Sequence, residues 1–430
     1  MTAPLEIVVV GAGQRAQLAY APYVEAFPEH VRVVAVAEPH PERRRQFAER
    51  FDLGDAQCFE SWEELLARPQ IAPALLNLTQ DPLHVESTLA ALERGYHALL
   101  EKPMAQTPED CVRLVQASER AGRILQICHV LRFTPFFSTL HRIIESGRLG
   151  QIISVEHREN IFYWHMAHGF VRGKWRNVST GSPLILAKCC HDMDILYWNH
   201  GRAKRIGSFG SLRHFRPEHA PQGAPVYCLD GCPAADECPF YAPRIYSGPL
   251  DQWPSAILSE SRTEQARLDA LRAGPYGRCV YHCDNDVVDH QVIVMELESG
   301  VSVSMTFVGH SHLGARTILI DGSRATLRAQ FSEMTGKYDI EIHDHLTNTA
   351  EQVPIAARAG GHGGGDFALM EAFVGALRAN QPDTLTSARN SMESHLMAFA
   401  AEEARVTGAF VPMADYRRRV ESASTLRGRG

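Results

Sequence analysis

Long hydrophobic runs are missing from this sequence of 430 residues. No run reaches the ~20 apolar residues that a membrane-spanning helix needs. The first ten residues also have neither a basic region nor an apolar core long enough for a secretion signal. We therefore expect a cytoplasmic protein that does not bind membranes.

The sequence also lacks an excess of positive charge. Its 43 Lys and Arg residues are outnumbered by 50 Asp and Glu residues, which gives a formal net charge of −7. Proteins that hold nucleic acid need a basic surface to neutralise phosphates, so no nucleic-acid partner is expected. The ten cysteines occur without a secretion signal, which favours reduced thiols or metal ligands over a disulfide framework.

The length and a hydrophobic share of 45% predict two domains, each with its own core. In the first, expected over residues 1–130, apolar strand-like runs alternate with helix-like segments. The strand candidates are residues 7–10, 31–37, 74–78, 97–100 and 124–129, and the helix candidates are 16–26, 41–51, 84–94 and 108–121. This alternation predicts an α/β domain with a doubly wound parallel sheet of the Rossmann type.

The second domain is expected over residues 131–415 and has a different pattern. A helix-like segment at 135–146 is followed by alternating runs at 287–297, 301–308 and 317–320, which predict strands of an open sheet. Residues 215–283 are rich in Pro, Gly, Cys and Tyr with little periodicity, and we interpret them as an ordered insertion. Helical periodicity returns at 366–404, and residues 416–430 are expected to form a basic tail of doubtful order.

A G-x-G-x-x-A motif, Gly11-Ala-Gly13-Gln14-Arg15-Ala16, lies between the first predicted strand and the first predicted helix. The first glycine permits a tight turn, the second lets the backbone approach a pyrophosphate, and the alanine allows the helix to pack closely on the strand. The helix N-terminus attracts negative charge. We predict that all five residues named in this motif contribute to a cofactor site.

Glu38, at the end of the second predicted strand, supports this interpretation. Its carboxylate can accept hydrogen bonds from both ribose hydroxyls of an adenosine and would repel the 2′-phosphate of NADP. NAD is therefore expected rather than NADP. The neighbouring Arg43, Arg44 and Arg45 offer an alternative anchor for that phosphate, but among acidic residues at helical spacing they are more typical of a solvated face.

With Glu101-Lys102-Pro103 at the end of the fourth predicted strand, the sequence resembles the Gfo/Idh/MocA family of NAD(P)-dependent oxidoreductases, which includes glucose–fructose oxidoreductase and inositol dehydrogenase. The matching segments are residues 11–16, 37–39, 79–84, 101–103, 147–150, 191–194 and 320–322. The resemblance implies a Rossmann domain followed by an α+β domain with an open, mainly antiparallel sheet. It also implies a carbohydrate-like substrate between the domains and a homo-oligomer, dimer or tetramer, that forms through the second sheet.

The resemblance further implies roles for single residues. Thr79, Asp81, His84 and Glu101 would line the cofactor, and Lys102 would reach both the nicotinamide ribose and the substrate. Oxidation of a carbinol removes the hydroxyl proton as hydride leaves for the nicotinamide, so a base and a cation must meet at one oxygen. His191 is a candidate for the base and Lys102 for the cation.

The sequence departs from the family pattern four residues before this histidine, where members commonly carry an acid and this chain has Ala187. Lys188 follows, and we expect its charge to lower the pKa of His191 and keep the imidazole neutral. Asp192 is an alternative proton acceptor and a candidate substrate ligand. Asp194 is a candidate for orienting the imidazole from the next helical turn.

Residues 163–176 mix aromatic side chains with polar donors, as a carbohydrate pocket does. His165, Arg172 and Trp175 are the candidate substrate ligands, and the alternative is an amphipathic segment that packs on the surface. In the glycine-rich stretch 360–366, His362 is either a further pocket residue or part of a flexible link that ends at Asp366, the N-cap of the next helix.

Cysteines gather in and just after the insertion, at Cys228, Cys232, Cys238, Cys279 and Cys283. A structural zinc would stabilise a segment with little apolar content, and an iron–sulfur cluster is a weaker alternative. The spacing is not diagnostic and five residues exceed the four ligands of such a site. No metal is assigned on this basis.

Together these features predict a dehydrogenase or reductase that transfers a hydride between NAD and a CH–OH group of a sugar, polyol or sugar derivative. One alternative is an NAD-dependent glycosidase, which oxidises a ring hydroxyl transiently so that the glycosidic bond breaks by elimination. A second alternative is a regulator without catalysis. The presence of Lys102 and His191 argues against the regulator.

Overall fold

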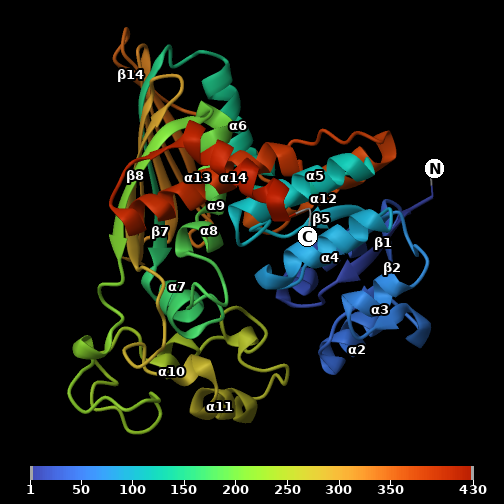
Figure 1. Ribbon diagram of the computed structural model, residues 1–430. Coiled ribbons are helices and arrows are strands. Elements are labelled where there is room, and N and C mark those ends of the chain that lie inside the picture. The colour runs from blue at the N-terminus through green and yellow to red at the C-terminus, as the bar shows by residue number, and fades with distance from the viewer. Residues whose placement is uncertain (1–2, 428–430) are drawn as a thin grey trace.

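The computed structural model describes residues 3–427, which form two β-sheets with helices around them (Figure 1). All neighbouring strands of the first sheet pair in parallel, in the order β3-β2-β1-β4-β5-β6. These strands are β1 (Leu5–Val10), β2 (Val31–Ala37), β3 (Cys58–Phe59), β4 (Ala74–Asn77), β5 (His97–Leu100) and β6 (Leu125–Ile127). The strand order reverses between β1 and β4, the place where open parallel sheets bind ligands.

Helices connect the parallel strands, as βαβ units require. They are the π-helical turn η1 (Ala16–Tyr20) leading into α1 (Ala21–Ala26), then α2 (Pro41–Arg50), α3 (Trp62–Ala67), α4 (His84–Glu93) and α5 (Pro108–Ala121). Local sequence explains the bounds of α5, since Thr107 caps its first turn and Gly122 ends it in the left-handed region. The predicted Rossmann domain is confirmed.

The second sheet has nine strands in the order β14-β13-β12-β11-β7-β10-β9-β8-β15. They are β7 (Ile152–Phe162), β8 (Ala203–Ser211), β9 (His290–Leu297), β10 (Ser302–Ser311), β11 (Ala315–Gly322), β12 (Ala325–Ser332), β13 (Lys337–Asp344), β14 (Thr349–Gln352) and β15 (Val411–Pro412). Only β7 and β10 pair in parallel, so the predicted open, mainly antiparallel sheet is confirmed.

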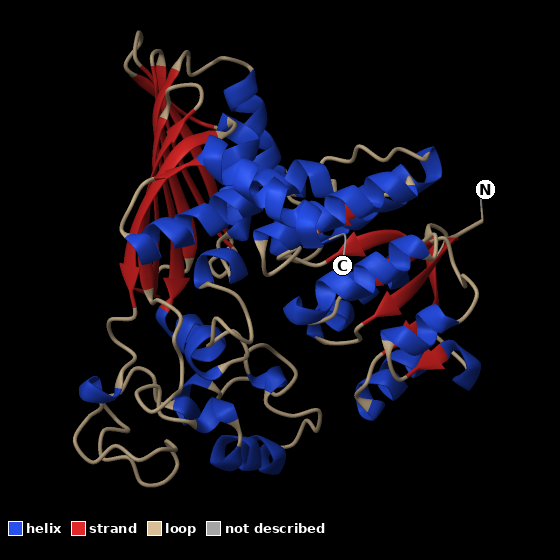
Figure 2. Cartoon of the chain, in the orientation of Figure 1, coloured by secondary structure: helices blue, strands red, loops and turns tan. Residues whose placement is uncertain are grey.

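Helices cover one face of the second sheet, and the other face is turned outward (Figure 2). Outside the insertion, the helices of the second domain are α6 (Pro135–Glu145), α7 (Tyr163–Met166), α8 (Leu184–Ala187), α9 (Cys190–His200), α12 (Gly365–Ala379), α13 (Ala388–Thr407) and α14 (Met413–Arg427). Helices α13 and α14 pack on β8, whereas α12 lies beside the first domain. In the part of the chain that the structure describes, none of the helices combines the length and apolar character needed to cross a membrane.

The insertion lies below the second sheet in the view of Figure 1 and contains α10 (Ala242–Ile245) and α11 (Glu264–Ala273) between long loops. It has a small core of its own, formed by Cys228, Ala242, Tyr246 and Leu271. It also reaches the first domain, because Glu260 pairs with Arg43 of α2 at 2.7 Å. The insertion is therefore anchored to both domains.

The expected tail of doubtful order is in fact helical. Helix α14 packs against α5, and Tyr416 and Val420 on its inner face are 4% and 2% exposed. Their spacing of four residues puts them on one face of a helix, but this short apolar stripe is hidden among arginines in the sequence. The expectation of a tail of doubtful order is therefore wrong for residues up to Arg427. The last residues of the predicted tail, 428–430, lie outside the described part of the chain.

Candidate functional site

The glycine turn after β1 has the shape that a dinucleotide needs. Gly11 has a φ of +91°, and a Cβ there would lie 2.7 Å from the carbonyl oxygen of Leu78. A Cβ at Gly13, by contrast, would meet no atom within 4 Å, so the backbone faces open space where a pyrophosphate fits. Ala16 is buried against β1, as close helix–strand packing requires, while Gln14 is exposed at the turn.

Glu38 lies directly beside this turn at the end of β2. Its two carboxylate oxygens accept hydrogen bonds from the backbone N–H groups of Ala12, at 2.8 Å, and His40, at 3.0 Å. The side chain is 5% exposed, so these bonds fix its orientation next to the open space at Gly13. Asp81 has a buried oxygen, Oδ2, without a hydrogen-bond partner among the described residues. This oxygen is available to accept a hydrogen bond from a ligand.

Arg15 connects three parts of the chain. Its Nε donates to Glu101 Oε1 at 2.6 Å and its Nη2 to Asp366 Oδ1 at 2.9 Å, while Tyr20 Oη donates to the same Glu101 oxygen. Burial alone would raise the pKa of Glu101, but the charge and hydrogen bond of Arg15, the charge of Lys102 and the hydrogen bond from Tyr20 together hold that pKa below its usual range. Arg15 and Glu101 thus join the Rossmann domain to α12.

Thr79 and His84 are held by protein contacts. Thr79 Oγ1 donates to Asn77 Oδ1 at 2.7 Å. The two ring nitrogens of His84 lie 2.7 Å from the carbonyl oxygen of Pro103 and 3.2 Å from that of Thr79. His84 therefore positions two loops at the edge of the sheet.

The two domains meet at Lys102 and His191. Lys102 Nζ donates a hydrogen bond to the carbonyl oxygen of Ala187 at 2.9 Å, four residues before His191. His191 is 7% exposed, and its Nδ1 has no hydrogen-bond partner among the described residues. Burial, then the charge of Lys102, holds the pKa of His191 well below its usual range. The imidazole is therefore neutral at pH 7 and can accept a proton.

Lys188 does not supply the charge that we expected at His191. Its Nζ pairs with Glu159 at 3.1 Å, and its charge acts on a different imidazole, that of His165. Burial, followed by Lys188, holds the pKa of His165 well below its usual range. The expected direction of the His191 shift holds, but its causes are burial and Lys102.

Asp192 and Asp194 have other partners than those the sequence indicated. Asp192 is fully buried and accepts hydrogen bonds from His157 Nε2 at 2.7 Å and Arg316 Nε at 2.8 Å. A carboxylate enclosed in this way cannot hold a substrate or take its proton, so these two assignments of Asp192 are corrected. Asp194 binds Arg132 through both oxygens, at 2.6 and 2.7 Å, and therefore stabilises the core rather than the imidazole.

Of the candidate substrate ligands in residues 163–176, two pack against other aromatic rings and the third binds backbone carbonyl groups. His165 packs at 4.9 Å between ring centroids on Trp253 of the insertion, and Trp175 packs at 6.0 Å on Phe170. Arg172 is only 1% exposed and donates to the carbonyl oxygens of Arg278, at 2.6 Å, and Phe240, at 2.7 Å. These contacts bind the insertion, so the assignment of Arg172 to substrate is corrected.

Two further side chains lie at the site. His362 Nδ1 contacts Asp366 at 3.0 Å, and the His362 ring lies 6.4 Å from that of His191. Lys174 is exposed, its Nζ lies 4.6 Å from the centre of the Trp175 ring, and the charges of Asp81 and Lys102 act on its ammonium. Lys174 is not among the residues predicted from the sequence, although its position beside Trp175 in the aromatic segment is a signal for it.

The cysteines of the insertion do not form a metal centre. All ten cysteines are free thiols. Among residues 3–427, no group of three or more His, Cys, Asp or Glu side chains is arranged to hold a metal ion. The structural zinc and the iron–sulfur cluster therefore find no support.

Comparisons with known proteins cover nearly the whole chain. A family model described as "Oxidoreductase family, NAD-binding Rossmann fold", of GFO_IDH_MocA, matches residues 5–129. Its companion, "Oxidoreductase family, C-terminal alpha/beta domain", matches residues 141–413.

Individual relatives have low sequence identity to this chain. The putative oxidoreductase YteT of Bacillus subtilis is 23% identical over 89% of this chain and 91% of its own length. Inositol 2-dehydrogenase of Streptomyces avermitilis is 28% identical over 52% of this chain and 60% of its own.

Solved structures share the fold. An oxidoreductase of Agrobacterium radiobacter in complex with NAD⁺, L-tartaric acid and magnesium has a TM-score of 0.68 at 14% identity, over 96% of this chain and 99% of its own. Levoglucosan dehydrogenase in complex with NADH and levoglucosan has a TM-score of 0.70 at 16% identity, over 95% and 99%.

Proposed function

The chain belongs to the Gfo/Idh/MocA oxidoreductase family, and on this premise we propose that it transfers a hydride between NAD and a hydroxyl-bearing carbon of a sugar, polyol or sugar derivative. The observation that carries the proposal is the meeting of Lys102 from the Rossmann domain with the segment that leads to the buried, neutral His191. Such a pair supplies a cation and a base to one oxygen.

Residues around the glycine turn would hold the cofactor. The open space at Gly13 suits the pyrophosphate, Glu38 suits the adenosine ribose, and the unpartnered oxygen of Asp81 offers an acceptor further along the sheet edge. When bound, NAD supplies the acceptor, or as NADH the donor, of the hydride. NAD is preferred over NADP because the Glu38 carboxylate disfavours a 2′-phosphate.

The neighbouring arginines do not change this preference. Arg43 pairs with Glu260 at 2.7 Å and Arg44 with Glu60 at 3.1 Å, while Arg45 pairs with Glu42 and Glu49 of its own helix. A 2′-phosphate would have to compete with these carboxylates for every one of the three cations.

The chain's own residues then carry the proton. In oxidation, His191 accepts the proton of the reacting hydroxyl while the ammonium of Lys102 stabilises the negative charge that develops on that oxygen. In reduction, the protonated imidazole of His191 returns the proton to the carbonyl oxygen, and Lys102 stabilises the negative charge that develops there as hydride arrives. Burial keeps His191 in the neutral form that can accept the proton.

An absorbance screen at the NADH wavelength tests the proposed function. Purified protein with NAD should form NADH with at least one member of a panel of sugars, inositols and sugar acids, and the His191→Ala variant should lose this activity. Absence of NADH formation across the panel, together with absence of NADH consumption by the matching ketoses and keto acids, would contradict the proposal.

We also propose that two copies associate through the outward face of the second sheet. Phe209 of β8 and Val292 and Val294 of β9 are exposed there, with Phe410 beside them. An exposed group of apolar side chains of this kind is typical of a protein interface. Phe209→Asp should shift the sedimentation coefficient toward that of one chain, whereas an unchanged oligomer in that variant would exclude this face.

A further inference from the structure

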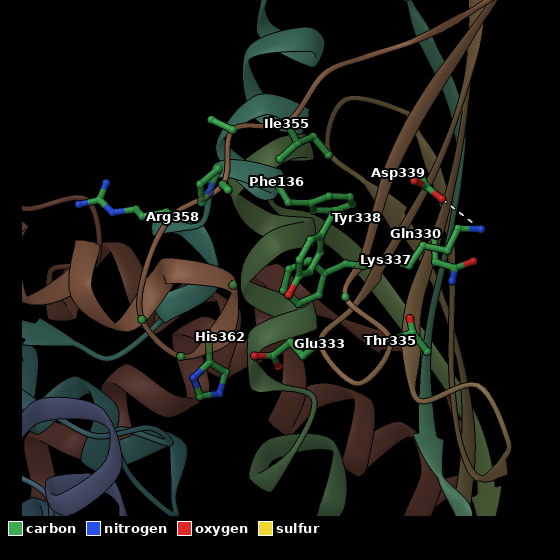
Figure 3. A pocket seen from close by; sticks show the side chains of 18 of the residues that line it. Phe136, Gln330, Glu333, Thr335, Lys337, Tyr338, Asp339, Ile355, Arg358 and His362 are labelled. Atoms are coloured by element: carbon green, nitrogen blue, oxygen red, sulfur yellow. Dashed lines mark ion pairs between the residues drawn. The ribbon is translucent and has the colours of Figure 1, made fainter. Parts of the chain in front are cut away.

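A large cavity adjoins the reaction centre and is not used by the chemistry described above. It has a volume of about 1080 Å³ and lies between the start of α6, the turn that joins β12 to β13, and residues 355–363, which we call the strap (Figure 3). This volume is at the upper end of the ~300–1,000 Å³ typical of small-molecule pockets, so one sugar ring would fill only part of it.

His362 connects the cavity to the reaction centre. It lines the cavity, and its ring lies 6.4 Å from that of His191. Its position is fixed from both sides, because Asp366 holds Nδ1 and the next residue, Gly363, has a φ of +61°. A Cβ at Gly363 would lie 3.2 Å from the Phe331 ring, so the strap packs directly on the wall of the cavity.

Aromatic rings form one wall of the cavity. Phe331 lies 5.2 Å from Phe136 and 5.0 Å from Tyr338, measured between ring centroids. Figure 3 shows Phe136, Tyr338 and Ile355 on one side of the cavity, with His362 and Glu333 at its lower end. Phe136 and Phe331 are each 2% exposed and support the wall from behind, so the partly exposed ring of Tyr338 is the one that suits the C–H face of a sugar ring or an aryl group.

The charged groups of the lining disfavour a phosphate. Lys337 pairs with Asp339 at 3.1 Å, and Arg358 pairs with Glu371, so both cations already have carboxylate partners. Glu333 is an exposed carboxylate of the lining and adds a negative charge. A carboxylate repels a diphosphate but accepts hydrogen bonds from hydroxyls, so the lining suits a neutral, hydroxyl-rich ligand.

We propose that this cavity is a second-ring subsite, and that the substrate is a glycoside or disaccharide rather than a single sugar or a nucleotide sugar. This inference rests on the proposed function. The first ring would present its hydroxyl to Lys102 and His191, and the group attached to it would pass His362 and pack against Tyr338. Glu333 would accept hydrogen bonds from hydroxyls of the second ring.

The test compares kcat/KM for paired substrates with NAD. Glucose, galactose and N-acetylglucosamine would each be measured beside their disaccharides, their 4-nitrophenyl glycosides and their UDP derivatives. We expect at least one disaccharide or aryl glycoside to exceed its monosaccharide by about tenfold or more. Tyr338→Ala and Glu333→Gln should each reduce this ratio toward one, and Glu119→Gln, at an exposed carboxylate of α5 outside the cavity lining, should not.

Different results separate the two proposals. NADH formation with the monosaccharides, but a ratio that neither variant changes, would overturn the subsite and leave the proposed function intact. A preference for the UDP derivative would also overturn it. If no sugar is oxidised, the proposed function fails, and calorimetry with the same disaccharides decides the subsite: binding that Tyr338→Ala abolishes supports it, and absence of binding in the wild type overturns it.

Discussion

Lys102 Nζ donates a hydrogen bond to the carbonyl oxygen of Ala187 across 2.9 Å, and this bond joins the end of β5 to the end of α8. It brings a cation of the first domain to the position where members of this family commonly carry an acid. Because a carbonyl oxygen carries no full charge, the ammonium keeps most of its charge for the reacting oxygen. The presence of Ala187 instead of an acid therefore does not remove the Lys102 cation from the site.

Replacement of Lys102 should affect turnover more than cofactor binding. We expect Lys102→Met to lower kcat by ~10²-fold or more, because the charge that develops on the reacting oxygen loses its stabilising cation. The dissociation constant of NAD, measured by fluorescence titration, should change little. Lys204→Met, at an exposed position of β8, should keep both values. A Lys102→Met enzyme with normal kcat would refute the role.

The pH dependence should report on Lys102 and not on Lys188. Burial and Lys102 lower the pKa of His191, so kcat/KM of the wild type should stay level as the pH falls through ~6.5. Removal of a nearby positive charge raises a histidine pKa, so Lys102→Met should move the acidic limb to higher pH. Lys188→Met should leave it in place, because that cation is paired with Glu159. If Lys188→Met moves the acidic limb and Lys102→Met does not, Lys188 rather than Lys102 lowers the pKa of His191.

Glu38 should determine the choice of cofactor. In Glu38→Ala, NAD should bind more weakly because its ribose loses a hydrogen-bond acceptor. The ratio of the dissociation constants of NADP and NAD should become smaller, because the carboxylate no longer repels the 2′-phosphate. Titration of both cofactors into wild type and variant measures this. Glu49→Ala on the exposed side of α2 serves as the control. Tighter binding of NADP than NAD by the wild type would contradict the assignment.

Acid should destabilise the protein through its buried histidines. Burial, followed by Arg172, lowers the pKa of His168 to about 4, so the native state leaves it neutral while the unfolded chain takes up a proton near pH 6.5. The unfolded state thus binds more protons between these values, and stability falls as the pH falls. The cost for this group is at most about 1.4 kcal/mol per pH unit.

Urea unfolding at a series of pH values measures this effect. His168→Gln should show a shallower fall in the free energy of unfolding between pH 6.5 and 4.5 than the wild type does. His345→Gln, at an exposed side chain, should keep the wild-type slope. Equal slopes for wild type and His168→Gln would mean that the imidazole is not buried in its neutral form.

The sequence by itself determined the Rossmann domain and its cofactor turn. Central parallel strands are buried on both faces, so β1 and β4 are nearly continuous apolar runs that can be recognised without knowledge of their partners. The positions of Gly11, Gly13 and Glu38 follow from that strand assignment. The helix caps are equally local, as Thr107 before α5 shows.

Much of the second domain could not be predicted in this way. Strand β7 buries His157, Glu159 and Asn160, so polar residues interrupt the apolar alternation that identifies a strand. These side chains are tolerated inside because they meet partners far along the chain, such as Arg316, which lies 3.1 Å from Glu159. Only the pairing of β7 with β10 and β11 brings such groups together.

The same reason separates the candidates that meet between the domains, Lys102 and His191, from the candidates that were corrected. His191 and Lys102 were recognised because each lies in a motif of its own, whereas the partners of Asp192, Arg172 and Lys188 depend on contacts far along the chain. A charged side chain next to a motif has the same sequence signature whether it faces a substrate or a buried ion pair. Tertiary structure decided between the two by burial, because a buried charge has to find its partner within the protein.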